Sequence, residues 1–424
     1  MPPSVATRAR GKRQRVLSGM RPTGRLHIGH YFGALSNWIR MQEEYDCFFF
    51  VADWHALTTD YADTSQIAQN RLEIVTDWLA AGLDPAKCTM FVQSSVPEHA
   101  ELHLLLSMVA PLELLERVPT YKEQLENIKD KDLHTYGFLG YPLLQSADIV
   151  IYDADLVPVG EDQVPHVELT REIVRRFNFF NGFKLRPDLT HEQKMRVLDE
   201  AFLNLPAGYY SKAASTDVEI RLLSGVREIG IANFLQKMGK LKKFFKVQTV
   251  LREPEAMLTE TPRILGTDGR KMSKSYGNAI ELGESDESIR AKAKVMMTDP
   301  ARKRREDPGN PEVCPVFSWH KLFSTPETIA WSDQGCRTAG IGCIECKAAM
   351  AEGLIRWIAP IRARRAEYES NPERVGEILR EGSKKARKVV GKTMRRVREA
   401  IFGSGAVSKT KAGAAPKTQA ALGS

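Results

Sequence analysis

The chain has 424 residues, a formal net charge of +8 at pH 7, and a composition that is 42% hydrophobic and 27% charged. This composition is typical of a soluble globular protein and excludes a collagen-like, largely disordered or disulfide-knotted chain, while the length favours two or more domains. Six cysteines are too few for a disulfide framework, and no apolar run approaches the roughly 20 residues of a membrane-spanning helix, so we expect a cytoplasmic protein without a membrane partner.

The first 15 residues form a basic arm that we expect to be disordered. The arm has no acidic residue, and its basic residues are Arg8, Arg10, Lys12, Arg13 and Arg15. A transit peptide would share this basic character, but the arm is short and has no apolar face, which disfavours that interpretation.

Residues 16–181 alternate short apolar runs with helical patterns. The expected strands span 16–19, 47–53, 89–93 and 156–159, and the expected helices span 29–42, 64–81, 97–110 and 164–177. This alternation predicts an α/β fold built on a Rossmann-like, doubly wound parallel sheet.

The rest of the chain is mostly helical in pattern. Residues 182–248 are predicted to form a helical insertion with helices at 191–205, 216–223 and 229–245, after which residues 249–289 complete the sheet domain. A helical C-terminal domain is expected over 290–403. Residues 404–424 lack aromatic and acidic residues, so we expect a disordered tail there.

The first chemical motif follows the first predicted strand and reads Arg-Pro-Thr-Gly-Arg-Leu-His-Ile-Gly-His from Arg21 to His30. In a doubly wound sheet this loop faces the ligand crevice, where Gly29 lets a nucleotide approach the backbone and the start of the next helix favours phosphate. His27 and His30 would lie on one side of a helical turn and can donate hydrogen bonds to phosphate oxygens. Two ordinary surface histidines are the simpler alternative.

The second motif, Gly-Arg-Lys-Met-Ser-Lys-Ser, spans 269–275, far downstream of the first. Its glycine and serines predict a mobile loop, and Lys271 and Lys274 can reach one triphosphate. Such a lysine pair suits a step in which pyrophosphate leaves, because cations stabilise the negative charge that develops late. A solvated basic loop is the simpler alternative.

Together the His-Ile-Gly-His and Lys-Met-Ser-Lys-Ser sequences resemble the two signatures of class I aminoacyl-tRNA synthetases. The stretches 17–19, 51–58, 140–148 and 157–171 resemble tryptophanyl-tRNA synthetases, and the likeness covers about 16–181 and 249–403. The resemblance implies a homodimeric ligase that uses ATP and Mg²⁺ to activate L-tryptophan and then transfers it to tRNA(Trp). Residues 290–403 would then bind the tRNA near its anticodon.

The resemblance also implies roles for individual residues. The catalytic residues that stabilise phosphate charge would be His27, His30, Lys271 and Lys274. The ATP contacts would be Arg21, Pro22, Thr23, Gly29, His30, Gly160, Glu161, Asp162, Ile264, Lys271, Met272, Ser273, Lys274 and Ser275, with a further phosphate contact from Lys122. The tryptophan pocket would consist of Tyr141, Gln145, Asp148, Gln163 and His55.

The indole ring has one N–H donor and no acceptor, so the carboxylate of Asp148 suits it as a partner. Phenylalanine would leave that carboxylate unpaired, and a site of this kind needs no editing domain. The principal alternative is a tyrosyl-tRNA synthetase, although the sequence Gly-Glu-Asp-Gln at 160–163, followed by His166 and Glu168, favours tryptophan. A non-charging, RNA-binding regulatory paralogue and a small-molecule nucleotidyltransferase are disfavoured by the two intact signatures.

Four late cysteines, Cys314, Cys336, Cys343 and Cys346, have the spacing C-x21-C-x6-C-x2-C. Four thiolates can hold either Zn²⁺ or a [4Fe–4S] cluster. The tight final triad favours the cluster, since zinc more often uses two C-x2-C pairs. A similar cysteine set with an iron–sulfur cluster occurs in some tryptophanyl-tRNA synthetases, which implies a structural or RNA-contacting role here. Four free thiols remain the alternative.

Basic residues gather at 237–246, 302–305 and, most densely, 383–398, where eight basic residues and no acid occur on a predicted helix. An apolar stripe on the same helix predicts that one face packs and the other presents cations. Contact with tRNA phosphates and a solvated helix face are both compatible with this pattern. The role of the insertion is left open.

Overall fold

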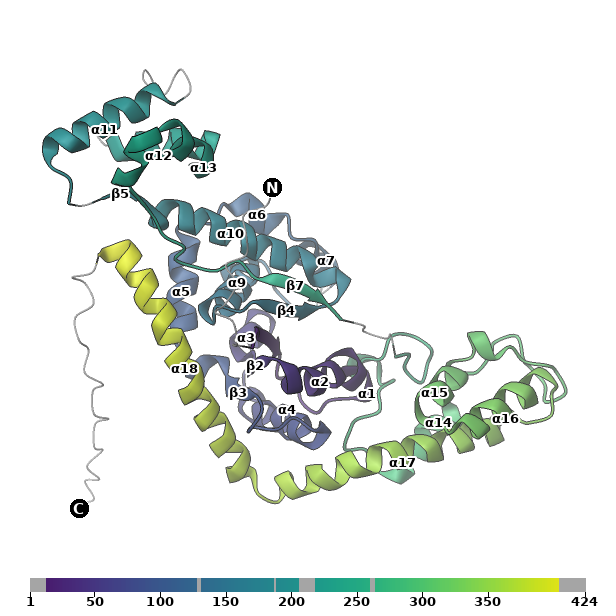
Figure 1. Cartoon of the computed structure of the whole chain (residues 1–424). Coiled ribbons are helices and arrows are strands. Elements are labelled where there is room, and N and C mark those ends of the chain that lie inside the picture. The colour runs from purple at the N-terminus through teal and green to yellow at the C-terminus, as the bar shows by residue number, and fades with distance from the viewer. Residues whose placement is uncertain (1–12, 128–130, 187, 206–217, 260–263, 404–424) are drawn as a thin grey trace, which may run out of the picture.

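The computed structural model describes residues 13–127, 131–186, 188–205, 218–259 and 264–403 (Figure 1). Most of the predicted arm and the whole predicted tail lie outside these residues. None of the described helices combines the length and the apolar composition that a bilayer crossing requires.

Five parallel strands form the central sheet in the order β3-β2-β1-β4-β7. Their bounds are β1 (Arg15–Met20), β2 (Asp46–Val51), β3 (Thr89–Val92), β4 (Leu156–Val159) and β7 (Glu255–Leu258). The strand order reverses beside β1, which is the arrangement of a doubly wound sheet and places a ligand crevice at the carboxyl ends of β1 and β4. The predicted fold class is therefore confirmed, with β7 as an additional, unpredicted edge strand.

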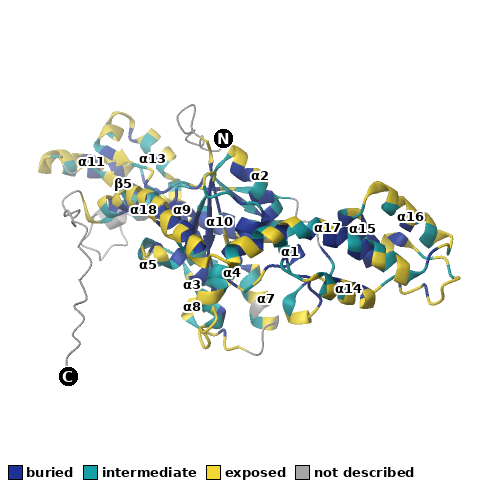
Figure 2. Cartoon of the chain, turned by 90° about the horizontal axis from the view of Figure 1, so that it is seen from below, coloured by how far each residue is buried: buried dark blue, intermediate teal, exposed yellow. Residues whose placement is uncertain are grey.

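Strand β2 shows why the sheet is buried on both faces. Phe48 and Phe50 pack in one hydrophobic cluster with Leu17 and Phe91, whereas Phe49 packs in the opposite cluster. A continuous apolar run of this kind is typical of a central parallel strand that helices cover on both sides. Figure 2 shows the buried residues concentrated in the sheet and on the inner faces of its helices.

Helices alternate with the strands in the first half of the chain. Their bounds are α1 (Ile28–His30), α2 (Ser36–Glu44), α3 (Asp53–Asp60), α4 (Ile67–Ala81), α5 (Glu98–Ser107), α6 (Leu112–Glu116), α7 (Pro119–Asn127), α8 (Tyr136–Leu139), α9 (Tyr141–Ile151) and α10 (Val164–Gly182). A π-helical turn, Tyr31–Leu35, joins α1 to α2. The second predicted strand ends earlier than expected because Asp53 already begins α3.

The segment from 183 to 247 packs around its own hydrophobic cluster, which includes Phe183, Phe234 and Phe245. It contains β5 (Phe183–Leu185), α11 (His191–Leu203), α12 (Val218–Ile229), α13 (Ile231–Lys237) and β6 (Phe245–Val247), and β5 pairs antiparallel with β6. The expected continuous helix over 229–245 is wrong. Gly239 adopts a positive φ of 53°, which ends the helical run and leads through a 3₁₀ turn into β6.

The C-terminal helices are α14 (Asp286–Val295), α15 (Pro315–Phe323), α16 (Pro326–Arg337), α17 (Cys343–Glu369) and α18 (Pro372–Phe402). Helix α17 packs on α14, α15 and α4, and α18 then turns back to lie against β3, as Figure 1 shows. The apolar stripe of α18, which includes Ala386, Val390 and Met394, joins the cluster that covers one face of the sheet. The last helix therefore packs on the sheet rather than on α14–α16.

Candidate active site

A pocket of about 370 Å³ lies at the carboxyl ends of β1 and β4, where the strand order reverses. Residues from β1, β2, α3, α8, α9, β4 and the segments that follow β1, β2 and β4 line it: Leu17, Ser18, Gly19, Arg21, Phe50, Ala52, His55, Thr58, Phe138, Tyr141, Gln145, Asp148, Ile149, Val157, Pro158, Val159, Gly160 and Gln163. All five residues predicted to bind tryptophan are among them. The structure thus brings together side chains from positions 55 to 163 in one concave site.

Asp148 is the most deeply buried acid of the pocket, with 1% of its surface exposed. Its carboxylate lies 2.8 Å from Nε2 of His55, 2.6 Å from Nδ1 of His99 and 2.8–2.9 Å from Nε2 of Gln93. Burial alone would raise the pKa of Asp148, but the hydrogen bonds from His55 and His99 outweigh burial and hold the pKa at about 2. The pocket therefore contains an ionised acceptor at neutral pH.

Tyr141 and Gln163 both line this pocket. The hydroxyl of Tyr141 is 2.6 Å from Oγ1 of Thr120, which in turn is 2.8 Å from Nε2 of His166. Burial raises the pKa of Tyr141, so the phenol stays protonated. Gln163 donates to its exposed neighbour Asp162 at 3.0 Å. The pocket thus combines apolar lining residues with a few hydrogen-bonding groups.

The two histidines of the first motif stack on each other, with ring centroids 3.7 Å apart. Desolvation lowers the pKa of His27 to about 4 and that of His30 to about 3, so both rings are neutral at pH 7. The backbone N–H of His27 donates to Nδ1 of His30 at 3.3 Å, which leaves the ring proton of neutral His30 on Nε2. His30 can therefore donate a hydrogen bond to an anion without being a cation.

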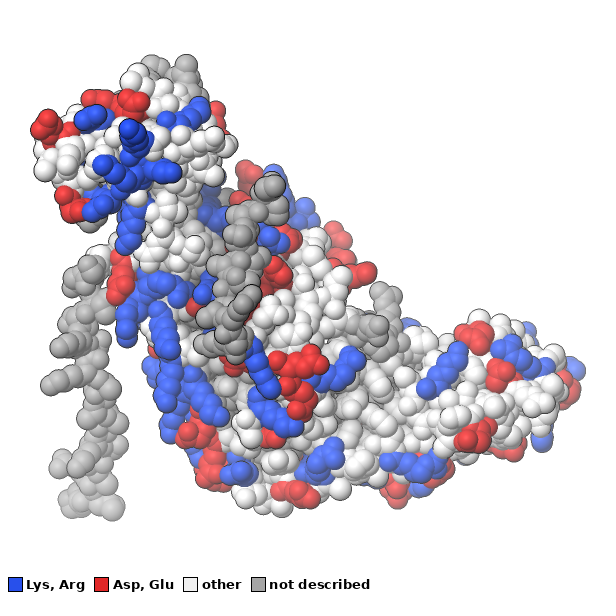
Figure 3. All heavy atoms as spheres, in the orientation of Figure 1, with Lys and Arg blue, Asp and Glu red and all other residues white. Residues whose placement is uncertain are grey.

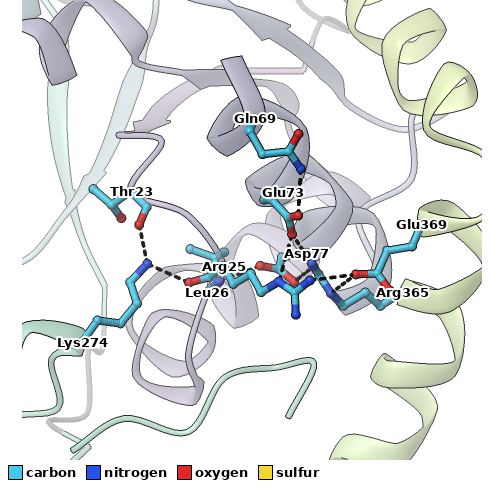
Figure 4. Close-up of polar contacts among 9 residues, drawn as sticks. All are labelled: Thr23, Arg25, Leu26, Gln69, Glu73, Asp77, Lys274, Arg365 and Glu369. Atoms are coloured by element: carbon cyan, nitrogen blue, oxygen red, sulfur yellow. Dashed lines mark hydrogen bonds and ion pairs between the residues drawn. The ribbon is translucent and has the colours of Figure 1, made fainter. Parts of the chain in front are cut away.

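The second motif meets the first directly. The backbone N–H of Ile28 donates to the carbonyl of Ile280 at 3.0 Å, and that of Leu282 donates to Leu26 at 2.8 Å. Lys274 donates to the carbonyl oxygens of Thr23 and Arg25, the latter at 2.9 Å (Figure 4). Two signatures that are far apart in the sequence therefore form one surface beside the pocket.

Asn278 anchors the second motif and was not predicted. Its side chain accepts from the backbone N–H of Ser273 at 2.7 Å and donates to Asp268 at 2.7 Å and to the carbonyl of Lys271 at 3.1 Å. Asn278 is 98% buried. Its position just after the motif was the one feature of the sequence from which this role could have been predicted. The loop is thus held at its base while Lys271 and Ser275 stay exposed.

A buried ion-pair network supports the first motif from behind. Arg365 of α17 pairs with Asp77 and Glu73 of α4, and with Glu369 at 3.1 Å. The other oxygen of Asp77 accepts the backbone N–H of Leu26 at 2.6 Å. Figure 4 shows these side chains in one row between α17 and the loop that Lys274 contacts. No sequence motif indicated this link between the C-terminal helices and the site.

The remaining predicted ATP contacts are distributed around this surface. Met272 is buried against Gly29, and its backbone N–H donates to the carbonyl of Ile264 at 3.2 Å. Glu161 and Asp162 lie exposed on a 3₁₀ turn after β4. Lys122 lies on α7 with an exposed side chain and does not line the pocket.

The four late cysteines line one small cavity with Arg302, Asp299 and Ile341. All four are free, and burial together with the neighbouring sulfurs raises the pKa of Cys346 to about 12. Arg302, predicted as part of a basic surface patch, is instead buried and donates to the carbonyls of Arg305 and Ile341. Within the described ranges, no group of three or more histidine, cysteine or acidic side chains is arranged to hold a metal ion.

Helix α18 presents fewer available cations than its sequence suggests. Of the eight basic residues at 383–398, four are engaged in ion pairs, namely Lys384 with Glu381, Arg387 with Glu98, Arg396 with Asp153 and Arg398 with Glu101. The other four, Lys385, Lys388, Lys392 and Arg395, are exposed. Figure 3 shows basic side chains gathered along α18 and on the insertion.

The family model described as class I tRNA synthetases (W and Y) matches residues 9–219 and 231–358. A tryptophan–tRNA ligase from Ralstonia nicotianae is 50% identical over 92% of this chain and 98% of the relative, and one from Thermotoga maritima is 46% identical over 91% and 98%. A crystal structure of tryptophanyl-tRNA synthetase from Campylobacter jejuni, complexed with ADP and tryptophan, superimposes with a TM-score of 0.70 at 29% identity, covering 92% of this chain and 99% of that one.

The sheet, the crevice and the two joined signature motifs define a class I aminoacyl-tRNA synthetase. The likeness extends over nearly the full length of the relatives, so no large part of their fold lacks a counterpart here. Within that class, the chain belongs to the tryptophan–tRNA ligases.

Proposed function

We propose that this protein activates L-tryptophan with ATP and transfers it to tRNA(Trp). Its relatives at 38–50% identity are tryptophan–tRNA ligases, and the chain is an enzyme of the same kind. The single observation that favours tryptophan within the site is the buried, ionised carboxylate of Asp148 in the pocket beside the joined signatures. An indole N–H is a matching donor for that acceptor.

In the first step the tryptophan carboxylate attacks the α-phosphorus of ATP, which forms tryptophanyl-adenylate and releases pyrophosphate. In the second step a ribose hydroxyl of the terminal tRNA adenosine takes the acyl group and AMP leaves. Neutral His27 and His30 would act as hydrogen-bond donors, while Lys271 and Lys274 would supply positive charge as pyrophosphate leaves. Mg²⁺ would accompany the ATP phosphates and offset their charge.

The tryptophan side chain would lie between Tyr141 and the β4 edge of the pocket, with its N–H on Asp148. Gln145 and His55 would line the ring, and Gln163 would orient the substrate ammonium or ribose. Arg21 and Gly160 support a nucleotide beside this position because both line the same pocket.

ATP–pyrophosphate exchange with each of the twenty amino acids tests this function. We expect exchange with tryptophan alone, and Asp148→Ala should raise the KM for tryptophan without a comparable change for ATP. Exchange with tyrosine instead would overturn the substrate, and an absence of exchange with every amino acid would favour the regulatory paralogue.

A homodimer is also proposed, because α5 and α6 expose three large apolar side chains within a short stretch. Leu104, Met108 and Leu112 are 55%, 72% and 62% exposed. Apolar side chains gathered in this way are typical of a protein interface. A second copy of the chain would cover them.

An enzyme of translation of this kind would act in the cytoplasm.

For the four cysteines we propose a [4Fe–4S] cluster, with Zn²⁺ as the alternative. The donor set supports this, since four free sulfurs, one just before α15, one on α16 and two on α17, border one cavity. Cys314, Cys336, Cys343 and Cys346 would be the ligands, and the site would tie the ends of α15, α16 and α17 together.

Anaerobic purification should give a brown protein with about four irons per chain. A colourless protein with one zinc per chain would contradict the cluster, and absence of both metals would leave four free thiols.

Residues 290–403 are proposed to bind tRNA, with 16–181 and 249–289 as the catalytic domain and 182–248 as an insertion of open role. The four exposed cations of α18 support this proposal as phosphate contacts.

A further inference from the structure

Two side chains behind Asp148, which the reaction does not use directly, form a buried row of hydrogen bonds. His99 of α5 and Tyr152, the residue after α9, are each completely buried. Nδ1 of His99 lies 2.6 Å from Oδ1 of Asp148, and Nε2 of His99 lies 2.7 Å from the hydroxyl of Tyr152. Neither residue lines the pocket, so neither touches a substrate held there.

The direction of donation along this row follows from chemistry. An ionised carboxylate only accepts, so Nδ1 of His99 must carry the proton that lies between the two groups. In neutral His99 the other ring nitrogen is an acceptor, and the hydroxyl of Tyr152 donates to it. Burial raises the pKa of Tyr152 well above its usual value, so that hydroxyl keeps its proton. Tyr152 therefore fixes the tautomer of His99 that donates to Asp148.

Gln93 completes the support from a different element. Its Oε1 accepts the backbone N–H of Trp54 at 3.1 Å, which turns its Nε2 toward both oxygens of Asp148. His99 and Gln93 thus hold the carboxylate from the buried side, while His55 donates from the pocket side. Each carboxylate oxygen therefore meets one histidine and shares the amide nitrogen of Gln93, so the orientation of the carboxylate is fixed from several sides. Asp148 still lines the pocket, where a ligand can reach it.

We propose that His99, backed by Tyr152, is a positioning residue that determines substrate specificity by holding the carboxylate of Asp148 in the orientation that accepts the indole N–H. The inference rests on the proposed tryptophan pocket. Burying a histidine, a tyrosine hydroxyl and a carboxylate is costly, and aromatic side chains already surround them, including Phe48 and Phe91 against Tyr152. An apolar residue could fill the volume of His99, but it could not aim the carboxylate.

The expected consequence of losing His99 is relaxed discrimination rather than simple loss of binding. Without that donor the buried carboxylate can turn or take up a proton. A protonated acid offers an O–H donor, for which the indole ring has no acceptor, whereas the phenol of tyrosine has one. Discrimination between ligands with and without the indole N–H should therefore collapse.

The test compares L-tryptophan with 3-benzothienylalanine, an isosteric analogue in which sulfur replaces the ring N–H. Dissociation constants are measured by calorimetry on the whole protein. In His99→Leu the ratio of the two constants should shrink by about tenfold, chiefly through weaker tryptophan binding. His99→Asn, whose amide nitrogen can replace Nδ1, should restore most of the ratio, and Tyr152→Phe should give an intermediate value.

If His99 had only a structural role, its loss would weaken the binding of both ligands equally. An unchanged ratio of the two dissociation constants in His99→Leu would therefore overturn the inference. If that variant does not fold, Tyr152→Phe decides, because it removes one oxygen atom and keeps the ring, and an unchanged ratio there contradicts the proposal. A failure of the proposed function would be recognised by a different result, because the wild-type protein itself would then bind tryptophan no more tightly than the analogue.

Discussion

At the scale of single residues, burial determines which groups of the site carry charge. His27 and His30 are desolvated and flanked by lysine, so their pKa values fall to about 4 and 3 and their rings are neutral at pH 7. Asp148 is buried even more completely, yet its pKa is held near 2 because donors surround it. The same burial therefore gives neutral donors on the ATP side and a charged acceptor on the amino-acid side.

The depressed pKa of His30 predicts a loss of stability in mild acid. The unfolded chain binds a proton at this histidine below pH 6.5, whereas the folded chain does so only near pH 3. Between those values the free energy of unfolding should fall with decreasing pH, with a contribution of up to about 1.4 kcal/mol per pH unit from this residue. Urea unfolding from pH 7.5 to 4.5 should show a shallower slope for His30→Gln than for wild type. Parallel curves for the two proteins would rule out this origin, and His191→Gln on the exposed face of α11 controls for the substitution.

At the scale of elements, most of the sheet could be predicted from the sequence, because short apolar runs indicate buried parallel strands. Strand β7 was missed, since Glu255–Leu258 forms an edge strand with partly exposed residues and only a short apolar signal. The pocket residues that lie within recognisable sequence motifs could also be predicted from the sequence. The roles of His99 and Asp77 could not be predicted, because they come from contacts between elements that no local pattern encodes. Gln93 alone had a signal, as a polar residue at the carboxyl end of a predicted strand.

The contact between α18 and β3 depends on one glycine. A Cβ at Gly382 would collide with the carbonyl oxygen of Met90, whereas a Cβ at Gly391 on the same helix would meet nothing within 4 Å. Gly382→Ala should therefore destabilise the protein by about 1–3 kcal/mol through overpacking. Gly391→Ala should stabilise it by about 0.5–1 kcal/mol through helix propensity. Chemical unfolding of both variants measures the difference, and equal stabilities would show that α18 does not approach β3 so closely.

At the scale of the whole molecule, the charge of +8 is not spread evenly. The arm carries five basic residues and 404–424 three lysines, so residues 16–403 have equal numbers of basic and acidic side chains. Attraction to tRNA over this region must then come from local arrangement. On α18, Arg387, Arg396 and Arg398 fasten the helix to α5 and to Asp153, while Lys388, Lys392 and Arg395 remain exposed.

The salt dependence of tRNA binding should show whether the exposed cations of α18 contact tRNA phosphates. Replacing Lys388, Lys392 and Arg395 by alanine should weaken binding and reduce the slope of log K against log salt concentration by about 0.7–0.9 for each lost phosphate contact. Filter binding or fluorescence anisotropy at several salt concentrations measures the slope. An unchanged slope would place the tRNA elsewhere. The same triple substitution at Lys240, Lys242 and Lys243 would show whether the insertion contributes.

The exposed apolar side chains of α5 and α6 lead to a prediction about assembly. Met108→Glu should shift the protein from dimer to monomer in sedimentation equilibrium, because a charge would be buried in the proposed interface. Met195→Glu on α11, where the wild-type side chain is 45% exposed, is the matched control and should leave the dimer intact. A wild-type monomer, or a dimer that survives Met108→Glu, would contradict this interface.

The return of α18 to β3 has a consequence for how the chain is made. Strand β3 and the sheet face that contains Phe91 are synthesised early, but the helix that covers them is the last one described and leaves the ribosome several hundred residues later. Domains generally fold as units from the N-terminus during synthesis, yet here the edge strand stays open until α18 has been made. A chain whose synthesis stops before α18 would carry a nearly complete sheet with an uncovered apolar face, which is a form that chaperones bind and that aggregates. Synthesis through α18 is thus part of what protects the sheet of the nascent enzyme from aggregation.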